Sequence, residues 1–275
     1  MTEQWITEEL HPYYRKSLRC LKMLVDEQTE FQHIQIAETE YFGKTLVLDG
    51  IIQLTELDNM GYHEMITHVP LLAQGNPRRV LIVGGGDGGS LEQVLRYPSV
   101  EEVVVCELDR RVVELSREYL TFFGKPYEDP RAKVVIQDAF VYLENSKNAF
   151  DVIISDTTDP IGEAEKLFSP EFYQRMVEAL TPGGTIATQC EQMYFDRSLI
   201  KGIMEMARGL VKNPAYYHTL VPTYPGGGIG FLYVSDQPWT NGLVRPYPPG
   251  RMNYLNPDMH RAAFALPEFF KRDLV

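Results

Sequence analysis

The second part of the chain alternates between short apolar runs and segments with helical periodicity, and this alternation constrains its fold most strongly. Apolar runs rich in β-branched residues that lack polar alternation are typical of strands buried on both faces of a sheet. The strand–helix–strand order therefore predicts an α/β fold built on a doubly wound parallel sheet. The expected strands are 79–84, 102–108, 133–138, 151–156 and 184–189, with helices at 110–120 and 170–180 among those between them.

Both ends of the chain have a different pattern. Residues 1–58 contain segments that alternate in period two, and Asp49-Gly50 is a typical two-residue hairpin turn. We expect a small antiparallel sheet domain over residues 1–58 and a second domain over residues 59–275, connected by a helix at 61–73. Near the other end, residues 216–227 and 228–236 predict an antiparallel strand pair at the sheet edge, followed by a turn and a short helix.

Composition narrows the classes of function. The 275 residues carry a net charge of −12, which disfavours nucleic acid as a partner and suits a cationic ligand. No apolar stretch approaches the length of a membrane span, so no membrane partner is expected. Three widely spaced cysteines predict neither a disulfide framework nor a zinc site, and they fit a cytoplasmic location.

Polar residues follow the predicted parallel strands at the edge where such sheets bind ligands. The first strand runs into the sequence GGGDGG, which contains Asp87. The next two end at Glu107 and Asp138, and the fourth ends at Asp156 within the sequence SDTTDP. The sequence therefore predicts a ring of carboxylates around one site.

Part of this ring suits a nucleoside. A glycine run between a strand and a helix permits close approach of a ligand to the backbone, although a plain tight turn is the alternative. Glu107, about 20 residues beyond the glycines, is placed to accept the hydroxyls of a ribose, or is simply an exposed acid at a strand end. Asp138 is a candidate acceptor for an adenine amine. The sequence GxxxxGK[ST] of ATP-binding P-loops is absent.

The remaining candidates suit a positively charged amine. Asp156 and Asp159 lie three residues apart, before Pro160, and such a pair can hold an ammonium group and accept its proton, or can stabilise a loop. His63 does not belong to an HExxH metal motif, and a buried, structurally bonded histidine is the alternative for it. Three further residues either line a pocket or pack in the core: Gln53, Tyr62 and Tyr224.

Several blocks in order resemble the polyamine aminopropyltransferases, most closely the spermidine synthase group. They run through nearly the whole chain and include LDGIIQLTELDNMGYHEMITHVPL, VLIVGGGDGG, FDVIISDTTDP, PTYPGGGIGF and YLNPDMHRAAFALPEF. The resemblance implies a small N-terminal β domain, a Rossmann-like catalytic domain related to class I methyltransferases, and a homodimer or homotetramer. It also implies aminopropyl transfer from decarboxylated S-adenosylmethionine to putrescine, which gives spermidine and methylthioadenosine.

The resemblance also implies a role for each candidate residue. Asp156 would be the catalytic base. The donor nucleoside and its aminopropyl tail would be bound by Gln32, Asp87, Glu107, Asp138 and Ala139. The acceptor would be bound by Gln53, Tyr62, His63, Asp159 and Tyr224. Decarboxylated S-adenosylmethionine is a co-substrate in this scheme, and neither a metal nor a cofactor is expected.

The chain departs from the usual pattern of that family at two positions near the expected adenine. Ala139 stands where a glycine is usual, and Glu163 stands where a proline is usual. Cadaverine, agmatine or spermidine remain alternative acceptors. A class I S-adenosylmethionine-dependent methyltransferase remains an alternative activity.

Overall fold

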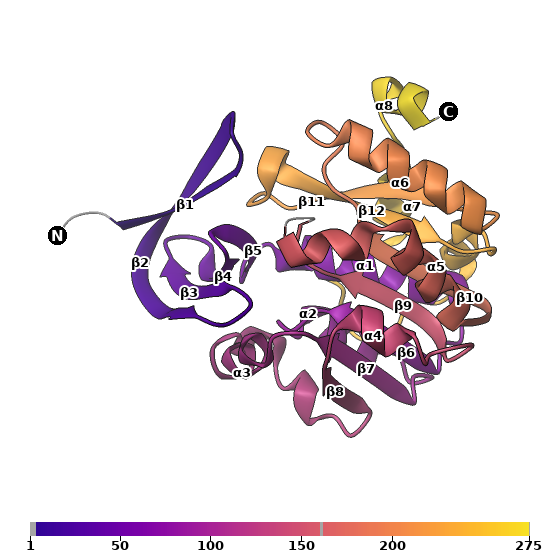
Figure 1. The fold of residues 1–275 in the computed structure, drawn as a ribbon, viewed down its shortest axis with the longest axis horizontal. Helices are drawn as coiled ribbons and strands as arrows, with labels where there is room; N and C mark the ends of the chain where they lie inside the picture. The colour runs from indigo at the N-terminus through magenta and orange to yellow at the C-terminus, as the bar shows by residue number, and fades with distance from the viewer. Residues whose placement is uncertain (1–3, 160–161, 275) are drawn as a thin grey trace.

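The computed structural model describes residues 4–159 and 162–274, excluding the side chains of residues 162 and 163. Pro160 and the Glu163 side chain, both considered above, lie outside the described part of the chain. Figure 1 shows two bodies side by side: a small sheet near the N-terminus and a larger body of sheet and helices. The small sheet is antiparallel, in the order β1-β2-β3-β4-β5. Its strands are β1 (Gln4–His11), β2 (Tyr14–Gln28), β3 (His33–Thr39), β4 (Gly43–Leu48) and β5 (Ile51–Thr55).

The larger sheet has the order β11-β12-β10-β9-β6-β7-β8. Strands β10, β9, β6, β7 and β8 are mutually parallel, while β12 is antiparallel to both of its neighbours. The α/β prediction and the edge hairpin are therefore confirmed. The strands are β6 (Arg79–Gly84), β7 (Glu102–Glu107), β8 (Ala132–Ile136), β9 (Phe150–Asp156), β10 (Leu180–Gln189), β11 (Ala215–Leu220) and β12 (Gly228–Val234).

Helices cover both faces of the larger sheet (Figure 1). The α-helices are α1 (Asn59–Gln74), α2 (Gly89–Leu95), α3 (Arg110–Tyr119), α4 (Ala139–Leu143), α5 (Pro170–Ala179), α6 (Arg197–Leu210), α7 (Pro257–Ala263) and α8 (Glu268–Leu274). In the described part of the chain, short 3₁₀ segments lie at Thr121–Phe123, Pro126–Glu128, Gly162–Phe168, Pro225–Gly227 and Trp239–Val244. No helix of the described residues is long and apolar enough to cross a membrane.

Strand β6 shows why the predicted runs lack polar alternation. Val80 and Ile82 pack in the core cluster that includes α1 and α2, whereas Leu81 and Val83 pack in the cluster that includes α5 and α6. All four side chains are at most 1% exposed. Because each face of the strand meets a layer of helices, alternate positions are equally apolar.

Two local expectations have different outcomes. Asp49 and Gly50 both have positive φ, 49° and 79°, as a tight hairpin turn between β4 and β5 requires, so that turn is confirmed. The C-terminal tail forms two helices, α7 and α8, where the sequence predicted one. Helix α8 follows Pro267 and packs Phe270 into the core, a tertiary contact that periodicity over so short a segment does not reveal.

A buried carboxylate attaches the C-terminal segment to α1. Glu64 is fully buried, and its two oxygens accept hydrogen bonds from the backbone N–H groups of Asn253 (2.8 Å), Tyr254 (3.0 Å) and Leu255 (2.7 Å). A charged acceptor that satisfies three backbone donors at once is worth more than a neutral one.

We expect Glu64→Gln to lower the free energy of unfolding by about 2 kcal/mol, because the amide loses the charge and turns a donor toward backbone N–H groups. Urea denaturation followed by circular dichroism measures this. Glu205→Gln, at an exposed position of α6, is the matched control and should change stability by less than about 0.5 kcal/mol. Equal stability of the two variants would contradict the assignment.

Candidate functional site

The carboxyl ends of the parallel strands border a cavity of about 320 Å³. Every candidate residue predicted from the sequence except Asp159 lines it: Gln32, Gln53, Tyr62, His63, Asp87, Glu107, Asp138, Ala139, Asp156 and Tyr224. Asp159 lines a smaller second cavity, which shares Gln53, Gln189 and Tyr224 with the first. The structure therefore brings the predicted residues together in one continuous region.

The glycine run after β6 brings two of the carboxylates close to each other. Gly84 pairs with Asp156 in the parallel ladder, and the Gly85 N–H donates to the Asp156 carbonyl oxygen at 2.8 Å. Gly84 has a φ of 72°, and a Cβ there would lie 2.2 Å from that same oxygen. Only glycine permits this approach, so the run carries Asp87 to a position beside Asp156.

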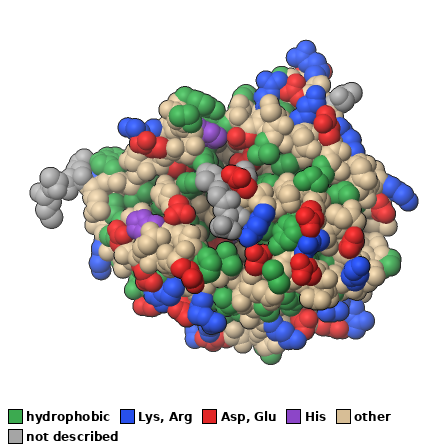
Figure 2. Space-filling view, viewed as in Figure 1, with side chains coloured by type: hydrophobic (Ala, Val, Ile, Leu, Met, Phe, Trp, Pro, Cys, Tyr) green, Lys and Arg blue, Asp and Glu red, His purple; other side chains and the backbone are tan. Residues whose placement is uncertain are grey.

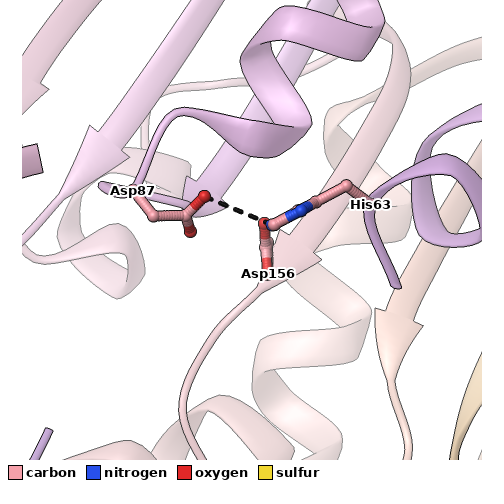
Figure 3. Close-up of side chains that lie close together, drawn as sticks. All are labelled: His63, Asp87 and Asp156. Atoms are coloured by element: carbon pink, nitrogen blue, oxygen red, sulfur yellow. Dashed lines mark ion pairs between the residues drawn. The ribbon is translucent and has the colours of Figure 1, made fainter. Parts of the chain in front are cut away.

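Three titratable side chains meet at this point, as Figure 3 shows. His63 of α1 places its Nε2 3.2 Å from Oδ1 of Asp87. The same Asp87 oxygen accepts the Gly89 N–H at 2.7 Å. Asp156 accepts the Ser90 hydroxyl at 2.6 Å. A Cβ at position 89 would lie 2.4 Å from the His63 ring, so glycine is needed there as well.

The pKa values of these three groups are shifted in different directions. Burial favours neutral Asp87, but the adjacent His63 and the Gly89 N–H outweigh it, and the pKa of Asp87 is lowered. Burial likewise opposes the charged form of His63, but Asp87 outweighs it and the pKa of His63 is raised. Burial and the charge of Asp87 raise the pKa of Asp156 to about 6. Asp87 is therefore the anion of the pair, while Asp156 is poised to take up a proton.

The same cavity carries the residues expected to bind a nucleoside. Glu107 accepts the N–H groups of Gly86 (3.2 Å) and Asp109 (3.0 Å), and burial raises its pKa to about 7. Gln32, which lies just before β3, donates to Oδ2 of Asp109 at 3.2 Å. The small antiparallel sheet and β7 therefore both contribute residues to the lining of this cavity.

Asp138 and Ala139 lie at the start of α4. Asp138 caps the helix by accepting the Phe140 N–H at 2.8 Å, and its other oxygen binds the Lys166 ammonium at 2.8 Å. Burial favours neutral Asp138, but Lys166 and the helix N–H groups lower its pKa overall. Ala139 is 7% exposed and lines the cavity together with Lys166.

Hydrogen bonds connect the first cavity to the second. The Tyr62 hydroxyl donates to Oε1 of Gln189 at 3.1 Å, and Nε2 of Gln189 donates to Asp159 at 3.1 Å. The Tyr224 hydroxyl donates to the Gln53 carbonyl. Burial, with Glu8 and Asp196 nearby, raises the pKa of Asp159 to about 6. The region where the two cavities meet, called the acceptor passage below, is therefore lined by aromatic rings and acidic groups.

The cluster of His63, Asp87 and Asp156 also offers three ligand atoms within 4.8 Å of one another, as a divalent metal would require. The hydrogen bonds of Gly89 and Ser90 to the carboxylates already hold these groups in place. The expectation that no metal takes part stays a prediction.

Sequence reasoning missed two residues that act on the predicted ones. Ser90 bonds Asp156, and its place in the first turn after the glycine run was a usable signal. Lys166 pairs with Asp138 across 28 residues, and no local pattern indicates this contact. On the face in Figure 2, acidic and basic side chains of the described residues are interspersed, without the broad basic patch that nucleic acid binding relies on.

Comparison with known proteins places both parts of the chain. Residues 4–56 match the family described as "Spermidine synthase tetramerisation domain", and residues 59–242 match "Spermine/spermidine synthase domain". A "Spermidine synthase" of Dictyostelium discoideum is 41% identical over 98% of this chain and 97% of that protein. A "Polyamine aminopropyltransferase" of Thermoanaerobacter sp. (strain X514) is 42% identical over 98% of both.

Solved structures agree with these matches. A spermidine synthase in complex with the transition state analogue AdoDATO superposes with a TM-score of 0.94 at 35% identity, covering 98% of this chain and 94% of that one. A spermidine synthase from Thermotoga maritima gives a TM-score of 0.91 at 34% identity, with the same coverage.

We expect Ser90→Ala to raise the pKa of Asp156 from about 6 to about 7, because a hydrogen bond to the charged form is lost. Carboxyl ¹³C NMR titration measures this. Ser146→Ala removes a hydroxyl that donates to the Tyr142 carbonyl at 3.0 Å instead, and it should leave the titration unchanged. A fall in the pKa of Asp156 would contradict the proposed contact.

Proposed function

The chain belongs to the spermine/spermidine synthase family, whose relatives are named as polyamine aminopropyltransferases, and we propose the reaction that its site supports. The protein transfers the aminopropyl group of decarboxylated S-adenosylmethionine to putrescine, giving spermidine and methylthioadenosine. The observation that carries the proposal is the largely buried pair of adjacent carboxylates, in which Asp87 has a lowered pKa and Asp156 a raised one. One anion is suited to hold a cation, and its neighbour is suited to accept a proton.

Asp87 recognises the tail of the donor. Loss of the carboxylate leaves that tail with an ammonium group beside a sulfonium, and an anionic side chain attracts both. The carboxylate of ordinary S-adenosylmethionine would meet Asp87 as a like charge, which costs about 4 kcal/mol at 4 Å and an effective dielectric constant of about 20. His63, bonded to Asp87 at 3.2 Å, holds this carboxylate in place.

Asp156 activates the acceptor. An alkylamine has a pKa near that of lysine, about 10, so it is protonated at neutral pH and lacks the free electron pair needed for attack. Asp156 removes the proton, and the nitrogen then attacks the carbon next to sulfur. The new C–N bond forms as the C–S bond breaks. The electron pair of the C–S bond stays on the sulfur, which becomes the neutral thioether of methylthioadenosine. The sulfonium is already a good leaving group, so the step requires no metal or redox cofactor.

The remaining residues position the two substrates for in-line attack. At the donor end, Glu107 accepts the ribose hydroxyls, and Gln32, Asp138 and Ala139 border the base. At the acceptor end, Tyr62 and Tyr224 enclose the methylene chain, Gln53 and His63 border it, and Asp159 holds the far ammonium. Lys166 keeps Asp138 oriented toward the cavity.

Assembly and location complete the proposal. The small sheet matches a tetramerisation domain and exposes large apolar side chains, with Trp5 50%, Tyr13 71% and Leu21 62% exposed. We propose that the chain forms a homodimer or homotetramer through this sheet and acts in the cytoplasm. Its partners are small diamine and nucleoside substrates.

The reaction is tested by assaying methylthioadenosine release from decarboxylated S-adenosylmethionine against a panel of amines. Asp156→Asn should reduce kcat with putrescine about a hundredfold or more, on the usual scale of general-base catalysis. In the unaltered protein kcat should fall as the pH drops through about 6, because protonated Asp156 cannot accept a proton. Near-normal turnover by a folded Asp156→Asn variant would remove this residue from the role.

Asp87→Asn separates this activity from methyl transfer. Without the anion, binding of the decarboxylated donor should weaken about tenfold, and discrimination against ordinary S-adenosylmethionine should shrink by a similar factor. Calorimetric titration of both donors measures the two affinities. An unchanged ratio would show that Asp87 does not select the donor, and a preference of the unaltered protein for ordinary S-adenosylmethionine would favour a methyltransferase.

A further inference from the structure

The second cavity extends the acceptor passage beyond Asp159 and ends among acidic side chains. It holds about 30 Å³ and is lined by Glu8, Glu191 and Asp196 in addition to Asp159. Glu191 is 5% exposed, and its Oε1 has no hydrogen-bond partner among the described residues. A buried acceptor without a donor favours an incoming N–H group. By itself, this end of the passage would suit an amine longer than a diamine.

A lysine of the small sheet changes the balance of charge there. Lys16 of β2 is 12% exposed, and its ammonium lies 2.8 Å from Oε1 of Glu8. It also donates to the Thr223 carbonyl and lies 5.7 Å from the centroid of the Tyr224 ring. Tyr224 lines both cavities. The chain therefore holds a cation of its own beside the wall of the acceptor passage.

The Lys16 ammonium is fixed by its surroundings. Oε2 of Glu8 accepts the Ile52 N–H at 2.8 Å, so the carboxylate that binds Lys16 is itself held by β5. The charges of Asp159 and Asp58 also act on Lys16, although burial dominates and lowers its pKa overall. Since Glu8 is paired within the protein, a ligand cannot bind it without competing with Lys16.

We propose that Lys16 is a specificity-determining residue, whose positive charge beside the wall of the acceptor passage, paired with Glu8, selects diamines over amines with a further ammonium group. This inference rests on the proposed function. A diamine places its second ammonium at Asp159 and has no further cation to place among the acidic residues of the second cavity. A linear triamine such as spermidine carries a further ammonium toward the second cavity, where the Glu8 carboxylate is already paired with Lys16. The Lys16 ammonium and this further ammonium are like charges, which repel even at the effective dielectric constant of a partly buried site.

A purely structural role for Lys16 makes a different prediction. If the lysine served only to neutralise Glu8, its replacement would favour spermidine only while the freed Glu8 carboxylate remains, and with Glu8 also replaced all acceptors would be affected equally. If it selects the acceptor, its replacement changes the ratio of kcat/KM for spermidine to kcat/KM for putrescine. Lys16→Arg keeps the charge and should keep the ratio. The ratio is thus a readout that loss of stability alone does not move.

The experiment measures this ratio by methylthioadenosine release. We expect the unaltered protein to prefer putrescine and Lys16→Met to raise the ratio about tenfold. Because that change leaves Glu8 buried and unpaired, the double variant Glu8→Gln/Lys16→Met provides a second test without an uncompensated charge. It should also raise the ratio, but less, because the attraction to Glu8 is removed. Lys22→Met, at an exposed position of the same strand, is the matched control and should leave the ratio unchanged.

The outcomes distinguish failure of the proposed role of Lys16 from failure of the proposed aminopropyl transfer. Turnover of putrescine with the same ratio in the unaltered protein and in both folded Lys16 variants would overturn the role of Lys16 and leave the proposed function standing. A preference of the unaltered protein for spermidine would also overturn it. Absence of turnover with every amine would instead refute the proposed function and, with it, the inference.

Discussion

The site depends on two adjacent carboxyl groups, Asp87 and Asp156, whose pKa values differ. The parallel register of β6 and β9 sets Gly84 beside Asp156, and the glycine run then returns Asp87 toward the same point. In a region from which water is largely excluded, two adjacent anions are unfavourable. His63 resolves this by pairing with Asp87, so Asp156 is left as the group with the raised pKa. The difference between the two carboxylates is therefore a property of their arrangement.

The same region shows why the two parts of the chain belong together. Val112 and Leu115 of α3 pack in one core cluster with Ile34 and Ile36 of the small sheet. This contact brings Gln32 into the lining of the cavity, and the hairpin of β4 and β5 brings Gln53 there. Glu8 of β1 lines the second cavity, and Lys16 of β2 pairs with it. The small sheet thus has a part in shaping the site besides the assembly for which its family is named.

Much of the architecture was predictable because its signals are local or periodic. Runs such as 79–84 lie between two helical layers, and their uniform apolarity follows from that position. The turn at Asp49 and Gly50 requires two residues that adopt positive φ, and the Asp-Gly pair is recognisable in the sequence as such a turn. Helix α8 was missed because its seven residues are held by two buried side chains, Phe270 and Leu274, in a distant core. Short segments stabilised by such contacts have no periodicity of their own.

The sequence by itself determined which chemistry was available: acidic residues placed at the ends of successive parallel strands must gather at one edge of the sheet. It did not determine how those acids share charge, since a pKa depends on burial and on neighbours remote in the chain. The pairing of His63 with Asp87, of Lys166 with Asp138 and of Lys16 with Glu8 was decided by tertiary structure alone. Each pair joins residues from different elements, and electrostatic interactions act through space, where the order of residues along the chain has no influence.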